Sequence, residues 1–346
     1  MGRKNKKYHK NLHDQAYDKL TSMQAFGESK KEAVLNGSDK NKIFSFNTYK
    51  TYWKHIKYFI RWMQQNYPEI KTLKKARAYV PEWLQSRVDQ IDKNGNHLSA
   101  WTIQTEAKAL AKLFDISPDD SDYFSPPKRR RVNIKRSRGA AVRDRHFSEK
   151  NNWELVCFAR GTGLRRSEME SLKGGNCKNI DELYMRMEEL KNKPDITEKE
   201  SKELKSIRDV LEQFPDEKYF VWVANGKGGR PRYSPILGDH KQDIVDRIKN
   251  TDSDKNVWEY VSSNADIHGY RADYATMIYK AYARNIKDIP YDKINKGTGK
   301  KYQGDVYACR GDEKGKKLDK RAMLKASKAL GHNRIDVVAN NYLRSL

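Results

Sequence analysis

The sequence predicts a mainly α-helical protein with a small β component, built from an N-terminal helical domain and a C-terminal α+β domain. Apolar residues recur at helical spacing through much of the first third of the chain. A single hairpin pattern, an apolar run followed by a Gly-rich turn and a second run, lies at 219–236. A strongly basic segment at 126–146 separates the two halves, and a chain of 346 residues allows each half its own core.

The charge of the chain indicates a polyanionic partner. Lys and Arg number 70 against 46 Asp and Glu, which gives a net charge of +24. Nucleic acid fits such a surface best, and an anionic membrane ranks second because no amphipathic anchor is visible. No run approaches the roughly 18 apolar residues of a membrane span, and the start MGRKNKKYHKN lacks the apolar core of a signal peptide. We therefore expect a cytoplasmic protein without a membrane partner.

The cysteines predict neither a disulfide framework nor a zinc site. Cys157, Cys177 and Cys309 have no CxxC-type spacing. Isolated cysteines in a chain of this kind are typical of reduced cytosolic thiols.

Residues 1–43 are expected to form a basic N-terminal arm. One helix is predicted from about His13 to Leu35, with a thin apolar stripe at Leu12, Ala16, Leu20 and Met23. So narrow a stripe predicts an arm that is only partly ordered until it docks, and its charge is compatible with arm-type DNA sites.

Residues 44–125 are predicted to be a bundle of three helices. The first, after a possible N-cap at Asn47, has the apolar face Tyr49, Trp53, Ile56, Ile60 and Met63. Its opposite face is basic and contains Lys50, Lys54, Lys57 and Arg61. The second helix spans about 76–91, and the third spans 100–114 with Ser99 as its cap. The basic face is either solvated or laid on DNA phosphates, and the bundle alone does not decide between these.

The segment 126–146 is predicted to be an extended basic linker. Residues 126–145 hold nine basic residues and one acidic residue, and like charges repel one another. Such a linker can follow a phosphate backbone and release counterions. The alternative for PPKRRRV is a nuclear localisation signal. The candidate DNA contacts are Lys128, Arg129, Arg130, Arg131, Lys135 and Arg136.

The remainder, 147–346, is predicted to be the α+β domain. Ser148 is the expected cap of a helix whose inward residues include Leu155 and Phe158, and 174–218 reads as a hydrophilic helical insertion. Four separated stretches of this half contain residues suited to phosphate chemistry. They are GTGLRRSEMESL, GKGG in the hairpin, HGYR, and LGHNRIDVVANNYL near the end.

In this order the four stretches resemble the catalytic domain of tyrosine recombinases, the phage-integrase type of site-specific DNA recombinase. The bundle ahead of it resembles that family's SAM-like core-binding domain. By this resemblance Tyr342 is the nucleophile that forms a 3′-phosphotyrosyl link. Arg165 and Arg271 are the arginines that clamp the nonbridging oxygens, a task that suits the planar, permanently charged guanidinium. Arg165 is preferred to Arg166 because it directly follows Thr162-Gly163-Leu164.

The resemblance assigns four further roles. Lys227, at the hairpin turn, would protonate the departing 5′-oxygen. His268 would hydrogen-bond the phosphate or assist proton transfer, and His332 would donate to a nonbridging oxygen. Glu168 would orient the other side chains. Each of these residues, considered alone, is as readily a surface or structural group.

The resemblance therefore implies site-specific recombination, integrating or excising a mobile element or phage, through cleavage, rejoining and a Holliday junction. It implies no cofactor and no metal. The implied partners are double-stranded DNA with specific sites, three further copies of the chain in a tetramer on DNA at the nucleoid, and accessory bending or directionality proteins. The alternatives are a catalytically silent DNA-binding protein of this fold and a relaxing enzyme like type IB topoisomerases. The long interval from Arg271 to His332 predicts an excursion near the DNA at 286–321.

Overall fold

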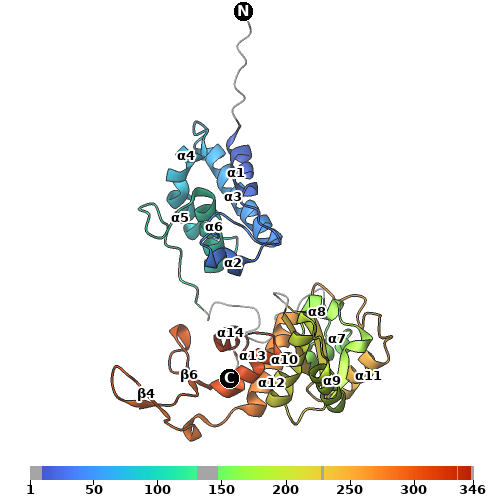
Figure 1. Ribbon diagram of the computed structural model, residues 1–346. Coiled ribbons are helices and arrows are strands. Elements are labelled where there is room, and N and C mark those ends of the chain that lie inside the picture. The colour runs from blue at the N-terminus through green and yellow to red at the C-terminus, as the bar shows by residue number, and fades with distance from the viewer. Residues whose placement is uncertain (1–9, 131–146, 227–229, 333, 344–346) are drawn as a thin grey trace, which may run out of the picture. The chain divides into compact units, whose positions relative to one another are not determined.

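The computed structural model describes residues 10–130, 147–226, 230–332 and 334–343 (Figure 1). The chain divides into two compact units between Arg129 and Arg130. Both units are mainly helical, and the strands are short and antiparallel. The predicted class, mainly α with a small β component, is confirmed at this level. Across the described ranges no helix combines the length and the apolar character that a membrane crossing requires.

The first unit is a bundle of helices. Its elements are α1 (Leu12–Thr21), α2 (Lys30–Leu35), α3 (Phe46–Asn66), α4 (Leu73–Ala76), a 3-10 turn (Arg77–Tyr79), α5 (Val80–Asp89) and α6 (Ala100–Phe114). Helix α6 begins as predicted, with the Ser99 hydroxyl accepting a hydrogen bond from the Thr102 N–H. The predicted cap Asn47 instead lies inside α3, because the extended residue Ser45 precedes the helix.

In the structure α1, Met23 and Ile43 pack in the apolar core of the first unit, so this segment is not a separate arm, although most of residues 24–42 are exposed. The buried α1 side chains Leu12, Ala16 and Leu20 belong to the same apolar cluster as the buried face of α3. The Gln15 side chain joins α1 to the start of α4, since its amide donates to Lys71 O at 2.8 Å and its Oε1 accepts from Leu73 N at 3.1 Å. A turn containing Gly27, with φ 87°, replaces the middle of the predicted helix.

The second unit contains eight longer helical segments and three small sheets among its described residues. The helices are α7 (Trp153–Thr162), α8 (Arg166–Glu170), α9 (Ile180–Asn192), α10 (Glu198–Gln213), α11 (Lys241–Lys249), α12 (Ile267–Tyr282), α13 (Lys320–Ala329) and α14 (Ile335–Asn341). The strands are β1 (Cys177–Asn179), β2 (Tyr219–Gly226), β3 (Arg230–Pro235), β4 (Lys293–Ile294), β5 (Lys301–Tyr302), β6 (Val306–Ala308) and β7 (Lys317–Asp319). The predicted hairpin is β2–β3. Ser148 does not cap α7, which starts at Trp153; its hydroxyl accepts from Asn151 N in the preceding turn.

The sheet β1–β2–β3 separates two apolar cores. Successive side chains of a strand point to opposite faces, and Phe220 of β2 packs in one cluster while its neighbour Val221 packs in the other. The Phe220 side is covered by α9, α10, α12, α13 and α14. The Val221 side is covered by α7, α8 and α11. The helices 180–213, predicted as a hydrophilic insertion, thus contribute buried side chains such as Leu183 and Ile207 to the core.

Candidate active site

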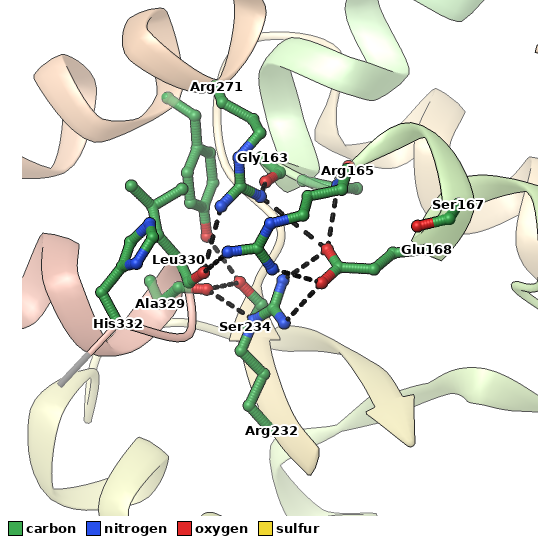
Figure 2. A network of polar contacts seen from close by, with 12 residues as sticks. Gly163, Arg165, Ser167, Glu168, Arg232, Ser234, Arg271, Ala329, Leu330 and His332 are labelled. Carbon is green, nitrogen blue, oxygen red and sulfur yellow. Dashed lines mark hydrogen bonds and ion pairs between the residues drawn. The ribbon is translucent and has the colours of Figure 1, made fainter. Parts of the chain in front are cut away.

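Polar side chains and backbone carbonyls from five segments of the second unit meet at the edge of the sheet (Figure 2). The segments are the turn after α7, the start of α8, β3, the first turns of α12, and the α13–α14 connection with the residue after α14. The residues they contribute are Gly163, Arg165, Glu168, Arg232, Arg271, Leu330, His332 and Tyr342. Stretches that are far apart in the sequence are therefore brought into one cluster.

Glu168 is the centre of the network. Its buried carboxylate accepts the Arg165 backbone N–H on Oε2 at 2.9 Å and the Arg165 Nη1 on Oε1 at 2.6 Å. From β3, Arg232 Nη1 donates to Oε1 at 3.1 Å and Nη2 donates to Oε2 at 2.8 Å. Each carboxylate oxygen thus receives two charge-assisted or backbone bonds, which fixes the orientation of Arg165.

Arg232 was not identified from the sequence, although it is the residue that joins three parts of the site. It is 6% exposed, and its Nε donates to Ala329 O at 2.9 Å, in the last turn of α13. Ser234, on the same strand, donates to the same carbonyl at 2.8 Å. The strand β3 therefore holds both Glu168 and the connection that leads to His332.

Arg271 is completely enclosed. Its Nη1 donates to Gly163 O, and its Nη2 donates to Leu330 O at 3.1 Å. Arg165 Nη2 reaches the same Leu330 carbonyl at 3.5 Å, so the two guanidiniums converge on one oxygen. Arg271 Nη1 lies 3.8 Å from Glu168 Oε2, and its Nε has no hydrogen-bond partner among the described atoms.

Two glycines shape the backbone that Arg271 and Arg232 contact. Gly163 ends α7 with φ 60°, and a Cβ there would lie 2.3 Å from the Tyr274 ring. Gly331 follows α13 with φ 72°, and a Cβ there would lie 2.9 Å from Arg232 Nη1. Only glycine combines this left-handed conformation with so close an approach.

The charges in the network shift the pKa values of its members. Burial alone would raise the pKa of Glu168, but the hydrogen bonds and charge of Arg232, together with Arg165, lower it to about 2. Burial lowers the pKa of Arg271 to about 10, opposed by Tyr342 and assisted by the charges of Arg165 and Arg232. Three guanidiniums then face one carboxylate, an excess of two positive charges at neutral pH.

Tyr342 and His332 complete the cluster. Tyr342 follows α14 and is 8% exposed; its hydroxyl lies 3.2 Å from His332 Nε2. The Arg271 guanidinium carbon lies 5.8 Å from the centre of the Tyr342 ring. The backbone before α14 is held by Ser327, whose hydroxyl makes contacts to His332 O at 3.1 Å and Arg334 O at 3.2 Å. A phenol with an imidazole within proton-transfer distance thus stands beside an excess of positive charge.

The two remaining residues predicted for the site are Lys227 and His268. Lys227 falls in 227–229, which the structure does not describe. His268 is exposed in the first turn of α12, three residues before Arg271. Arg166 points elsewhere, since its Nη2 donates to Ser263 O at 2.9 Å. Arg165, not Arg166, is therefore the arginine of the cluster.

The basic residues predicted to contact DNA are on α3 and in the segment 128–136. The α3 residues Lys50, Lys54, Lys57 and Arg61 are all exposed, on the side opposite the buried face of the helix. Lys57 stands over the Trp53 ring at 5.8 Å. Lys128, Arg129 and Arg130 are exposed, whereas Arg131, Lys135 and Arg136 fall outside the described residues.

Among the residues that the structure describes, no group of three or more His, Cys, Asp or Glu could hold a metal ion. Comparison with models of known protein families gave no match to this chain, and comparison with curated proteins gave none either. The function is therefore inferred from the geometry and chemistry of the cluster.

Proposed function

We propose that this chain is a site-specific DNA recombinase that cuts and rejoins DNA through a covalent link between Tyr342 and a 3′-phosphate. The observation that carries the proposal is the position of the Tyr342 phenol, 3.2 Å from His332 and over the Arg271 guanidinium, beside a cluster with two excess positive charges. A phosphodiester carries negative charge that grows on its nonbridging oxygens in the transition state. Preorganised cations are the strongest stabiliser of such charge.

In the proposed step the Tyr342 oxygen attacks phosphorus, and the bond from phosphorus to the 5′-oxygen breaks. The phenolic proton passes to His332, whose Nε2 is within reach. Once protonated by this transfer, His332 can donate to a nonbridging oxygen, the role that the resemblance gives it. The 5′-oxygen takes a proton from Lys227, the group that the resemblance assigns to this role. Because the phosphotyrosine retains the energy of the broken bond, a 5′-hydroxyl can reverse the step and seal the strand without another energy source.

Arg165 and Arg271 would bind the nonbridging oxygens by exchanging the Leu330 carbonyl for phosphate. This exchange is favourable because a charged acceptor binds guanidinium more strongly than a neutral carbonyl does. The buried, unpartnered Arg271 Nε is a further donor at this place. Glu168 and Arg232 remain behind the phosphate and keep Arg165 in position.

The first unit would act as a SAM-like core-binding domain, with the exposed basic side of α3 on the phosphate backbone. Four copies of the chain would assemble on two DNA sites and exchange strands through a Holliday junction. The exposed lysines of α3 and the net charge of +24 support DNA as the partner.

The test is the trapping of a covalent complex on nicked duplexes taken from the DNA that flanks the gene. A nick next to the scissile phosphate lets the leaving fragment diffuse away, so the protein stays attached. We expect an adduct with the native chain and none with Tyr342→Phe, while DNA binding is kept.

The matched control is Tyr282→Phe, which removes a hydroxyl from a half-buried tyrosine of the same unit outside the cluster. It should form the adduct as the native chain does. Retained cleavage by Tyr342→Phe would overturn the proposed nucleophile. Relaxation of any supercoiled plasmid, with no dependence on paired sites, would instead favour a topoisomerase-like activity.

A further inference from the structure

The segment 291–302 is an exposed hairpin that extends away from the helices of the second unit (Figure 1). Its strands β4 and β5 pair Lys293 with Tyr302 and Ile294 with Lys301. Every residue from 291 to 302 is exposed. A two-stranded ribbon of this kind is marginally stable on its own, so its position depends on its attachment to the unit.

The base of the hairpin is firmly attached. The buried Gln303 amide donates to Ile286 O and to Ile289 O, each at 2.7 Å. Arg284 binds Asp319 at 2.8 Å and Asp305 at 3.0 Å, and Asp319 is fully buried. A ribbon anchored by buried hydrogen bonds and ion pairs presents its tip in a defined direction.

The cationic side chains at the base of the hairpin have polar partners, whereas those at the tip do not form ion pairs with described residues. At the base, Arg284 and Arg321 are paired with carboxylates, and Lys320 donates to Gly304 O at 2.6 Å. At the tip, four lysines have no carboxylate oxygen of a described residue within 4.0 Å of the ammonium nitrogen. They are Lys293, Lys296, Lys300 and Lys301.

The single acid of the tip, Asp292, offsets only one of these four charges. Asp292 also accepts the Gly304 N–H at 2.8 Å. Four lysines against one carboxylate leave a surplus of three positive charges on twelve residues.

Three large side chains of the hairpin are exposed beside these lysines. Tyr291 is 61% exposed, Ile294 is 62% exposed and Tyr302 is 46% exposed. Tyr302 is the cross-strand partner of Lys293, so a phenol and an ammonium share one face of the ribbon. Ammonium and tyrosine hydroxyl groups are both donors to phosphate oxygens.

Charge decides whether this surface binds a second copy of the chain or a DNA duplex. A second copy of the chain carries the same net charge of +24 and would be repelled by the lysines. A duplex offers closely spaced phosphates that release counterions when lysines bind. The complementary partner is therefore DNA.

We infer that the hairpin 291–302 of the second unit is a further DNA-binding surface. It binds the phosphate backbone of a duplex at a place other than the scissile phosphate. The inference rests on the proposed function only in taking DNA as the partner. The lysines supply affinity that does not depend on sequence, and the anchored base fixes where along the duplex they act.

The experiment replaces all four tip lysines by glutamine (K293Q, K296Q, K300Q and K301Q) in the full chain. The dissociation constant for a duplex of unrelated sequence is measured between about 50 and 200 mM salt. We expect the slope of log affinity against log salt to fall by about two to four, because each phosphate neutralised by a lysine contributes about 0.9 to that slope.

Two further variants test whether a lower slope reflects lost contacts of the hairpin with phosphate, and not a change in the net charge or the folding of the chain. A matched control replaces four other exposed lysines of the same unit: Lys150, Lys199, Lys241 and Lys280. Its slope should change by less than about one, the value of a single phosphate contact. A variant with arginine at the four tip positions keeps the charge and should keep the native slope.

The possible failures are distinct. If the native chain does not bind duplex DNA at all, the proposed function fails together with this inference. If the native chain binds and the glutamine variant keeps its slope, or the matched control falls as far, the hairpin is not a DNA contact and the proposed function stands. Loss of self-association without DNA in the glutamine variant would also overturn the inference.

Discussion

Replacing Arg232 by alanine tests whether this residue holds the site together. The change removes two bonds to Glu168 and one to Ala329 O, and leaves a buried carboxylate with Arg165 as its main partner. The fall of the Glu168 pKa from 4.5 to about 2 corresponds to about 3 kcal/mol of stability at neutral pH. Loss of one partner of a buried pair typically costs about 3–5 kcal/mol, which agrees with this value.

The pKa of Glu168 determines how the cost of Arg232→Ala changes with pH. Because the folded pKa of Glu168 lies below its unfolded value, its stabilisation is complete above about pH 5 and is lost as the pH falls toward 2. With the Glu168 pKa back at 4.5 in the variant, Arg232→Ala should cost about 3 kcal/mol at about pH 7 and about 2 kcal/mol at about pH 3.5.

The assay is urea unfolding of the full chain labelled with 5-fluorotryptophan. The fluorine signal of Trp258, a buried residue of the second unit, reports that unit alone. Arg186→Ala is the control, since Arg186 forms more exposed pairs with Glu189 and Glu203 and should cost less than about 1 kcal/mol. A cost below about 1 kcal/mol for Arg232→Ala, or one that does not change with pH, would refute the assigned role.

Three other changes have specific expected results. Gly163→Ala introduces a Cβ at φ 60° against the Tyr274 ring and should destabilise the second unit by about 1–3 kcal/mol; an unchanged melting temperature in calorimetry would contradict this. Arg271→Lys keeps the charge but loses the planar fork, so cleavage of the nicked duplex should fall at least about 100-fold while DNA affinity changes little. Retained cleavage would exclude Arg271 from the phosphate site. Glutamine at 128–131 should weaken binding and lower the salt slope by about one for each phosphate that is no longer neutralised, and an unchanged slope would mean that this segment does not touch phosphate.

The elements that could be predicted are those whose pattern is local. The buried face of α3, the Ser99 cap of α6 and the β2–β3 hairpin follow from apolar spacing and turn residues, and all three are present. The thin stripe of α1 predicted an arm, because the sequence does not show that α3 and α4 provide the rest of its core. The strand β1 was missed because three residues carry too little pattern.

The site was predictable only where each residue stands in a recognisable stretch. Arg165, Arg271, His332 and Tyr342 were named from such stretches, and the structure brings them together. Arg232 lies in RPRYS, where an arginine is ordinarily solvated. Its partner Glu168 stands 64 positions earlier, so burial of the pair depends on tertiary contacts. The sequence contains one signal for this pair: Arg232 is the second arginine of a predicted strand and stands beside apolar residues. An arginine at such a position suggests that a buried acid faces it.

The most direct measurement is mass spectrometry of the trapped protein–DNA complex after digestion with nuclease and trypsin. Trypsin releases Tyr342 in the peptide of residues 335–344, IDVVANNYLR. We expect this peptide to carry a nucleotide joined through its 3′-phosphate to the tyrosine oxygen. A nucleotide on any other residue, or a 5′-phosphate link to Tyr342, would contradict it.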